Sequence, residues 1–386
     1  MSGASPSTVA RRVTLKLMLP GLLAVFIYQF MTALEVFEVP AVLGVPAGIY
    51  VFSTKIYVLL HSDTFVPDYG NADALAILYL GVAVIATVLY MRVIARKERF
   101  GVITGKGYRP KIIDLGSWRV PAFLLVMAFL CFSIILPLMV FIYVSLLPFF
   151  QSTSLASIES FTLRHYAELA EVDLISKILW NTVTMTFVAA TLTVVISFFV
   201  SWVVIRTDFK WRRILDQLAF IPHAIPGIVM GLAFLWVYFY FSDLGLPIYG
   251  SIWGISIAFA VGFMAYGTRS MNAALLQIHK DLDEAAQVSG ACQWRTMWRI
   301  FLPLMLPTFV GLWVWAVLHA IRIAGLPLIL YEGPDNQVLA ILVWHMWNEG
   351  YLESVAAIGT LLILFLFFIT LILRLVGFGR GVRLQK

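Results

Sequence analysis

A glycine-lysine pair, Gly105-Lys106, has the residue types of a phosphate-binding loop. Such a loop cradles phosphate oxygens with backbone N–H groups and has the form GxxxxGK followed by Ser or Thr. Here Gly101 stands one residue too close to Gly105, and Gly107 follows the lysine. The spacing argues against a nucleotide site, and we expect this chain to bind no cofactor.

Metal-ligating and nucleophilic side chains form no catalytic pattern either. The six histidines show no HExxH or other zinc spacing, and Cys131 and Cys292 form no CxxC pair. No Ser-His-Asp or paired-carboxylate arrangement stands out. An enzyme needs such a reactive constellation, so we expect a non-catalytic chain without a metal site.

One histidine lies in a proline-rich bend formed by Pro222, His223, Pro226 and Gly227. Proline removes a helical hydrogen bond, and its ring clashes with the preceding turn. In a membrane, the freed carbonyl groups must be covered by protein or water. Two interpretations stay open: a bend that lines a translocation pathway, and a kink that serves packing alone.

The composition shows which elements must position these residues. Of 386 residues, 61% are hydrophobic and 12% are charged, against about 45–50% and about 25% in soluble domains. The chain is therefore expected to be an all-α polytopic protein of the lipid bilayer, which excludes a soluble enzyme or a nucleic-acid reader. The net charge of +6 comes from basic residues beside apolar runs and indicates topology rather than a nucleic-acid partner.

A membrane-spanning helix needs about 20 mostly apolar residues. Eight runs are predicted as spans: 17–34, 73–91, 120–148, 178–205, 214–241, 251–268, 304–324 and 355–375. Lys and Arg gather in alternate connections and at the C-terminus, so both termini are expected in the cytoplasm. The run 39–60 is interrupted by Pro and Gly and is predicted to be an outer-side loop or a re-entrant segment.

The chain also resembles itself at an offset of 287 residues. Ser2-Gly3-Ala4 aligns with Ser289-Gly290-Ala291, and Leu17-Met18-Leu19-Pro20 aligns with Leu304-Met305-Leu306-Pro307. Transporters are often built from such repeats. We therefore expect residues 1–95 to be the last two spans of a first repeat, 96–117 a cytoplasmic linker and 118–386 a complete six-span repeat. The missing part of the first copy predicts a truncated chain or a start assigned too late.

Residues 269–303 combine short helix-forming stretches with a glycine. Leu275 to Val288 is predicted to be one helix, ended at Gly290, which permits a positive φ. A second short helix should lead to Pro303 at the membrane surface. Two short helices around a glycine turn would make a protruding knob that fits a groove on a cytoplasmic partner.

The spacing in this stretch resembles the EAA loop of binding-protein-dependent ABC importer permeases: EAA, three residues, G, nine residues, I, one residue, LP. The matching positions are Glu284, Ala285, Ala286, Gly290, Ile300, Leu302 and Pro303. The resemblance implies an ABC importer permease fold, in which this coupling loop (residues 269–303) docks on a separate ATPase chain that carries ATP and Mg²⁺. The first copy keeps Gly3, lacks the Glu-Ala-Ala residues, and has Val13, Leu15 and Lys16 where Ile, Leu and Pro are expected.

Other segments are similar to the two-repeat permeases of ferric-iron uptake. They are Glu35 to Pro40 with Gly48 to Phe52, Ile225 to Val229, and Tyr266 to Asn272. The resemblance implies a multi-pass protein of the bacterial inner membrane that receives ferric iron from a periplasmic or extracellular binding protein. Polyamine, thiamine and aminoethylphosphonate permeases share this architecture and stay open, as do a membrane enzyme and a passive channel or scaffold.

The repeat places Glu35 opposite Arg322, near the outer ends of two equivalent spans. Ionisable side chains at such depth tend to face a partner or a watery cavity. Glu35, its neighbour Glu38 and Arg322 are therefore candidates for the pathway mouth. Either Glu35 pairs with Arg322 as an outer gate, or each side chain separately reaches the interface.

Overall fold

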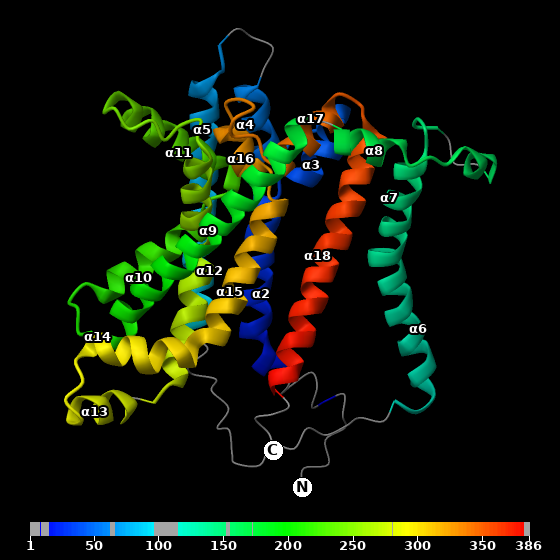
Figure 1. Ribbon diagram of the computed structural model, residues 1–386. Helices are drawn as coiled ribbons and strands as arrows, with labels where there is room; N and C mark the ends of the chain where they lie inside the picture. The colour runs from blue at the N-terminus through cyan, green and yellow to red at the C-terminus, as the bar shows by residue number, and fades with distance from the viewer. Residues whose placement is uncertain are drawn as a thin grey trace. The chain divides into compact units, whose positions relative to one another are not determined.

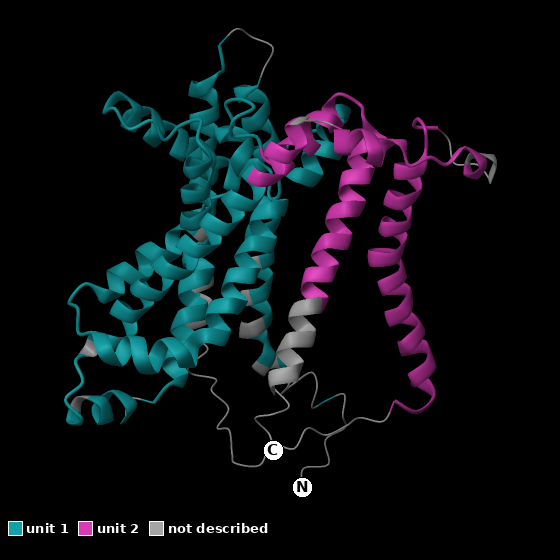
Figure 2. Cartoon of the chain, viewed as in Figure 1, with its two compact units in different colours: residues 1–103, 181–337 teal, residues 104–180, 338–386 magenta. Residues whose placement is uncertain are grey.

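A computed structural model of the chain is built of helices throughout the part that it describes, which comprises residues 8, 15–61, 66–95, 115–151, 155–171, 173–279 and 281–381. The helices fall into two compact units, residues 1–103 with 181–337 and residues 104–180 with 338–386 (Figure 2). The predicted all-α class is confirmed for the described residues.

The first unit consists of residues 1–103 and 181–337, and Figure 1 labels most of its helices. It contains α2 (Leu15–Glu35), α3 (Glu38–Leu43), η2 (Val45–Ala47), α4 (Phe52–Leu60), α5 (Tyr69–Ala95), most of α9 (Asp173–Arg206), α10 (Arg212–Phe220), η7 (Ile221–Ala224), α11 (Gly227–Asp243), α12 (Ile252–Gln277), α13 (Asp281–Val288), α14 (Gln293–Thr296), η8 (Met297–Phe301), α15 (Leu302–Arg322) and α16 (Gly325–Leu330).

The second unit contains η4 (Gly116–Trp118), α6 (Arg119–Leu130), the π-helical turn η5 (Cys131–Ile135), α7 (Leu136–Leu146), η6 (Leu155–Ser160), α8 (Arg164–Glu171), α17 (Leu339–Asn348) and α18 (Leu352–Gly381). Its core joins Leu169, Ile178, Leu339, Ala357 and Ile358. A ring nitrogen of His165, which is buried, lies 2.9 Å from the Leu147 carbonyl oxygen. This contact gives His165 a structural role within the second unit.

Five helical segments of the described residues are long and apolar enough to cross a membrane: Tyr69–Leu89, Gly116–Leu146, Leu174–Arg206, Trp294–Arg322 and Leu352–Leu371. A sixth is obtained if the pair Val25–Glu35 and Glu38–Ala47, bent by 45°, counts as one broken span. Five of the eight predicted spans are therefore among these segments and a sixth overlaps the bent pair, whereas the runs 214–241 and 251–268 are not among them.

The first difference is the run 214–241, which is not one helix. α10 ends at Phe220, a 3₁₀ turn spans Ile221–Ala224, and α11 begins at Gly227 and is only 17 residues long. Pro226 directly precedes α11 with an extended backbone (ψ 148°). The two prolines lack the N–H groups that a continuous helix would need, so the predicted break at 222–227 is confirmed.

The second difference is the run 251–268, which lies in a helix of 26 residues, α12. α12 is long enough for a span, but its three glycines, two serines and single Tyr, Thr and Arg residues place its hydropathy below that of the five candidate segments. The run 39–60 also differs from a plain loop. It forms the short helices α3, η2 and α4, the first of which belongs to the bent pair.

Three pairs of helices begin at the offset seen in the sequence. α2 and α15 begin at Leu15 and Leu302, α3 and α16 at Glu38 and Gly325, and α4 and α17 at Phe52 and Leu339, each pair 287 positions apart. α2 and α15 both have 21 residues, and α3 and α16 both have six. These helix boundaries agree with the offset at which the sequence resembles itself.

Candidate functional site

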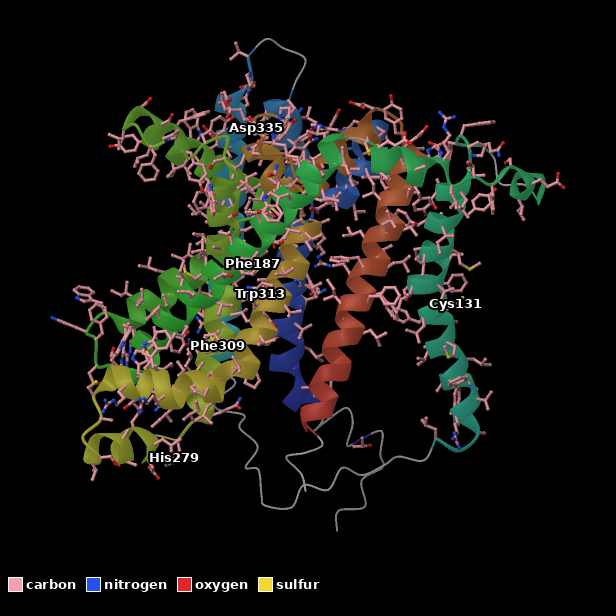
Figure 3. All side chains as sticks on the ribbon, viewed as in Figure 1. Cys131, Phe187, His279, Phe309, Trp313 and Asp335 are labelled. Atoms are coloured by element: carbon pink, nitrogen blue, oxygen red, sulfur yellow. The ribbon has the colours of Figure 1, made fainter. Side chains whose placement is uncertain are left out.

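The coupling loop forms two short helices that lie with α10 at one end of the first unit (Figure 1). α12 ends at Gln277, and Ile278 has an extended backbone (φ −85°, ψ 120°), so α13 begins separately at Asp281. The prediction of one helix from Leu275 to Val288 is therefore wrong. Figure 3 marks His279 in this break, at the end of the unit opposite to Asp335.

The turn after α13 has the glycine conformation that the sequence predicts. Gly290 has φ +75°, in the left-handed region, and a Cβ added there would meet no atom within 4 Å. The N–H of Ala291 donates to the Ala286 carbonyl at 2.9 Å, and that of Ser289 donates to the Ala285 carbonyl at 3.1 Å. Backbone conformation, and not lack of space, therefore requires glycine at this turn.

The three residues of the Glu-Ala-Ala motif face different ways. Glu284 and Ala285 are exposed, whereas Ala286 is 7% exposed. Large apolar side chains also lie open to solvent on the loop: Leu282, Val288, Trp294 and Trp298. Exposed apolar groups of this kind, rimmed by charges, are typical of a protein interaction surface.

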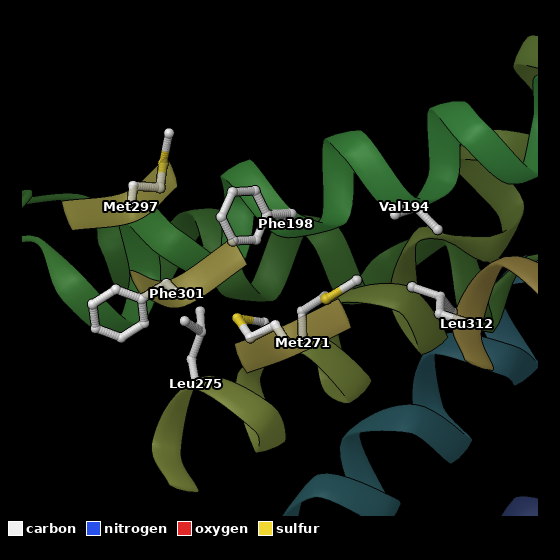
Figure 4. Packing of buried hydrophobic residues seen from close by; sticks show 8 residues of the cluster. Val194, Phe198, Met271, Leu275, Met297, Phe301 and Leu312 are labelled. Atoms are coloured by element: carbon white, nitrogen blue, oxygen red, sulfur yellow. The ribbon is translucent and has the colours of Figure 1, made fainter. Parts of the chain in front are cut away.

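The end of the motif continues into the membrane helix. Phe301 is fully buried, and Ile300 and Leu302 pack on the same core cluster with Met271, Leu275 and Met305 (Figure 4). Pro303 follows the π-helical turn η8 inside the continuous helical segment Trp294–Arg322, where a regular helix would use its missing N–H. Ile300 and Leu302 fasten the loop to the core that α9, α12 and α15 form, whereas Pro303 is exposed.

Arg206, the last residue of α9, lies behind the loop. Its guanidinium donates to Asp283 Oδ2 at 2.7 Å and to the carbonyl oxygens of Leu275 at 2.7 Å and Ile278 at 2.6 Å. It also lies 4.7 Å from the ring centroid of Phe301. By taking the last carbonyls of α12, Arg206 gives the physical reason why α12 ends before α13.

Sequence reasoning placed Arg206 only among the basic residues that indicate topology. The two partners, Arg206 and Asp283, are 77 residues apart, and neither belongs to the EAA pattern. One feature of the sequence indicated this contact: Asp283, directly before Glu284, is a candidate partner for a basic residue at the end of a neighbouring span.

A second polar contact joins α10 to α12. Arg269 Nη1 donates to Asp216 Oδ2 at 3.2 Å, and Asn272 Nδ2 donates to Asp216 Oδ1 at 3.2 Å. The Arg269 guanidinium also lies 4.9 Å from the Phe220 ring centroid. Asp216 therefore ties the start of the coupling loop to the helix before the proline break.

The candidate gate residues Glu35 and Arg322 end the equivalent helices α2 and α15. Both side chains are exposed, and among the described residues no ion pair joins them. The connection between the two helix pairs runs instead through Glu38, whose Oε1 accepts a hydrogen bond from the Ala324 N–H at 3.0 Å.

The same place holds a second, reciprocal contact. A Cβ added at Gly325 would lie 3.4 Å from the Phe37 Cβ. At the offset of 287, Phe37 corresponds to Ala324 and Glu38 to Gly325. Glu38 therefore contacts the counterpart of Phe37, and Phe37 lies against the counterpart of Glu38. We call Phe37, Glu38, Ala324 and Gly325 the reciprocal contact.

The proline break lies next to this contact. α11 packs on α16, because a Cβ added at Gly227 would lie 3.9 Å from Leu326, and one at Gly231 only 3.0 Å from Ile329. The structure therefore brings Pro226 and Gly227, at the start of α11, to the helix that carries the reciprocal contact. The side chain of His223 and the residue Gly3 lie outside the described part.

Within the described residues, no group of three or more His, Cys, Asp or Glu side chains is arranged to hold a metal ion. Aromatic contacts join α9 to α15: the exposed Phe187 meets the half-buried Trp313 edge to face at 5.6 Å (Figure 3), and Trp313 Nε1 donates to Thr191 Oγ1 at 3.2 Å. The candidate site thus consists of the coupling loop at one end of the first unit and the reciprocal contact toward the other.

Comparison with known proteins relates the sequence of this chain to a protein family. Residues 194–380, which include the coupling loop, match the family described as "Binding-protein-dependent transport system inner membrane component". The "Ferric transport system permease protein FbpB" of Actinobacillus pleuropneumoniae is 26% identical over 352 residues, 90% of this chain and 49% of that protein. The "Putative ferric transport system permease protein FbpB 1" of Haemophilus influenzae is 26% identical over 80% of this chain and 47% of its own length. The chain spans about half the length of these two relatives.

A solved structure supports the fold. The bacterial alginate ABC transporter in complex with an alginate pentasaccharide-bound periplasmic protein has a chain with a TM-score of 0.53 and 17% identity. The match covers 67% of this chain and 93% of that one. Residues 194–380 thus belong to the binding-protein-dependent transport system inner membrane family, and the chain has the fold of a solved ABC transporter chain.

Proposed function

We propose that the chain is the permease subunit of an ABC importer that takes up ferric iron delivered by a periplasmic or extracellular binding protein. The observation that carries this proposal is the coupling loop. It presents Glu284, Ala285 and exposed apolar side chains on two short helices, while Arg206 and the core cluster hold it from behind.

The partner at the loop would be a cytoplasmic ATPase, which supplies ATP, Mg²⁺ and hydrolysis. Leu282, Val288 and Trp294 offer it apolar area, and Glu284 offers a charge at the rim. With the loop in the cytoplasm, the reciprocal contact would lie toward the outer side, where a binding protein docks. Both termini would then be cytoplasmic, as the basic connections predict.

The substrate proposal rests on the relatives that cover most of the chain, which are named for ferric transport. A second candidate is sulfate, because the "Probable sulfate transport system permease protein cysT" of Chlorokybus atmophyticus is 28% identical over 44% of this chain. Permeases for polyamines, thiamine or aminoethylphosphonate remain alternatives from the sequence resemblance.

Uptake by proteoliposomes that contain the full-length permease, its ATPase and its binding protein tests this proposal. We expect ATP-dependent uptake of radiolabelled ferric iron that unlabelled sulfate does not reduce. Uptake of labelled sulfate with no iron uptake would overturn the iron assignment. Absence of a complex between permease and ATPase would overturn the importer assignment itself.

A further inference from the structure

Arg206 joins four structural elements through one side chain. It belongs to α9 and contacts Asp283 on α13, the last carbonyls of α12 and the ring of Phe301 in η8. The side chain is 5% exposed and that of Asp283 is 25% exposed. This ion pair is therefore shielded from solvent and is stronger than a surface pair.

The contacts of Arg206 need a guanidinium and not merely a positive charge. Its two terminal nitrogens point to different elements: Nη1 toward the Asp283 carboxylate and Nη2 toward the two carbonyl oxygens. The planar group also stacks on Phe301. A lysine ammonium is a single point charge that cannot reproduce the fork and the stacking together.

The helices that Arg206 joins are closely packed above it. A Cβ added at Gly267 in α12 would lie 2.1 Å from Ser197 Oγ in α9, so the two backbones approach as closely as glycine allows. Ser201 Oγ, one turn before Arg206, donates to the Thr268 carbonyl at 3.2 Å. A displacement of the end of α9 is therefore expected to move α12 with it.

We propose that Arg206 is the positioning residue that links the coupling helix α13 to the membrane helices α9 and α12. Movement of α13 on the ATPase pulls on Asp283, and Arg206 passes that displacement to α9 and to the end of α12. This role rests on the proposed function, because it assumes that α13 docks on the ATPase. It adds a residue outside the EAA motif through which the motif acts.

Two conservative variants test this link. Arg206→Lys keeps the charge but removes the fork, and Asp283→Asn removes the ion pair while leaving both carbonyl contacts of Arg206 in place. In full-length permease reconstituted with its ATPase and binding protein, we expect each variant to lower solute transported per ATP hydrolysed by about tenfold. The double variant should lose about as much transport per ATP as either single variant, because both substitutions act on one link.

A second measurement does not need the partner. In the purified full-length permease, amide hydrogen exchange of α13 should become about tenfold faster in either variant, while exchange in α9 and α15 stays unchanged. Arg212 and Asp208 provide the matched control, because they form an exposed arginine-aspartate pair at 3.7 Å, only a few residues after Arg206. Arg212→Lys and Asp208→Asn should change neither quantity.

The outcomes separate the two proposals. If the wild-type permease binds no ATPase, the proposed function is wrong, and the link can no longer carry coupling. If the ATPase binds but Arg206→Lys and Asp283→Asn match the controls in transport per ATP and in exchange, Arg206 is not the link. If the variants lower only protein yield and leave transport per ATP unchanged, its role is structural, and the proposal is overturned.

Discussion

The Glu38 carboxylate accepts a hydrogen bond from the backbone N–H of Ala324, a residue 286 positions away. Glu38 begins α3, and Ala324 directly precedes α16, which begins 287 positions after α3. A carboxylate at the start of a helix satisfies an N–H group that has no partner within the helix. Glu38, at the start of α3, thus caps the start of α16.

Removing this cap should weaken the first unit. We expect Glu38→Ala to lower the stability of the permease by about 1–2 kcal/mol, because the N–H of Ala324 loses its charged acceptor. Glu38→Gln keeps an acceptor and should cost about half as much. Thermal unfolding of the detergent-purified protein measures both, with Glu349→Ala as an exposed control. Equal effects of Glu38→Ala and Glu349→Ala would show that the contact contributes nothing.

Glu35 and Arg322 should behave as independent residues. Since no ion pair joins them in this structure, the effects of Glu35→Gln and Arg322→Gln on transport should add within about 0.5 kcal/mol in a double-mutant cycle. Transport by the two single variants and the double variant, measured in one full-length background, gives this number. A larger coupling energy, restored by exchanging the two charges, would instead support the paired outer gate.

Packing of α9 against α12 depends on Gly267. Gly267→Ala should destabilise the protein by about 1–3 kcal/mol, since the added Cβ meets Ser197 at both Oγ and Cβ. Ser197→Gly removes both atoms and should restore part of the loss. Gly262→Ala on the same helix has no atom within 4 Å of the added Cβ and serves as the control. No difference between Gly267→Ala and Gly262→Ala in thermal unfolding would contradict the close approach.

The glycine turn of the coupling loop gives a fourth prediction. Gly290 has φ +75°, a conformation that β-branched residues avoid. Gly290→Val should therefore distort the turn between α13 and α14 and reduce co-purification of the ATPase. Gly290→Asn should be milder, since asparagine adopts this conformation more readily. Gly311→Val in α15 also adds a side chain in open space, and is the control. Normal ATPase binding by Gly290→Val would show that the turn geometry does not matter.

The features predictable from the sequence are local ones. The glycine turn at 290, the break at Pro222 and Pro226 and the long apolar helices follow from spacing, ring chemistry and hydropathy. The split of α12 from α13 was missed because it depends on Arg206, which approaches from another helix. The reciprocal contact was missed for a similar reason: the alignment matches Glu38 with Gly325, but only folding brings Glu38 to Ala324.

The exposed Cys292, between Gly290 and α14, allows the most direct test of the docking loop. In full-length permease with every other cysteine replaced, a charged maleimide should label Cys292 readily. With the ATPase at about ten times its Kd, labelling should slow about tenfold, because only the free fraction reacts. Unchanged labelling of Cys292 in a complex that demonstrably contains the ATPase would contradict docking on this loop.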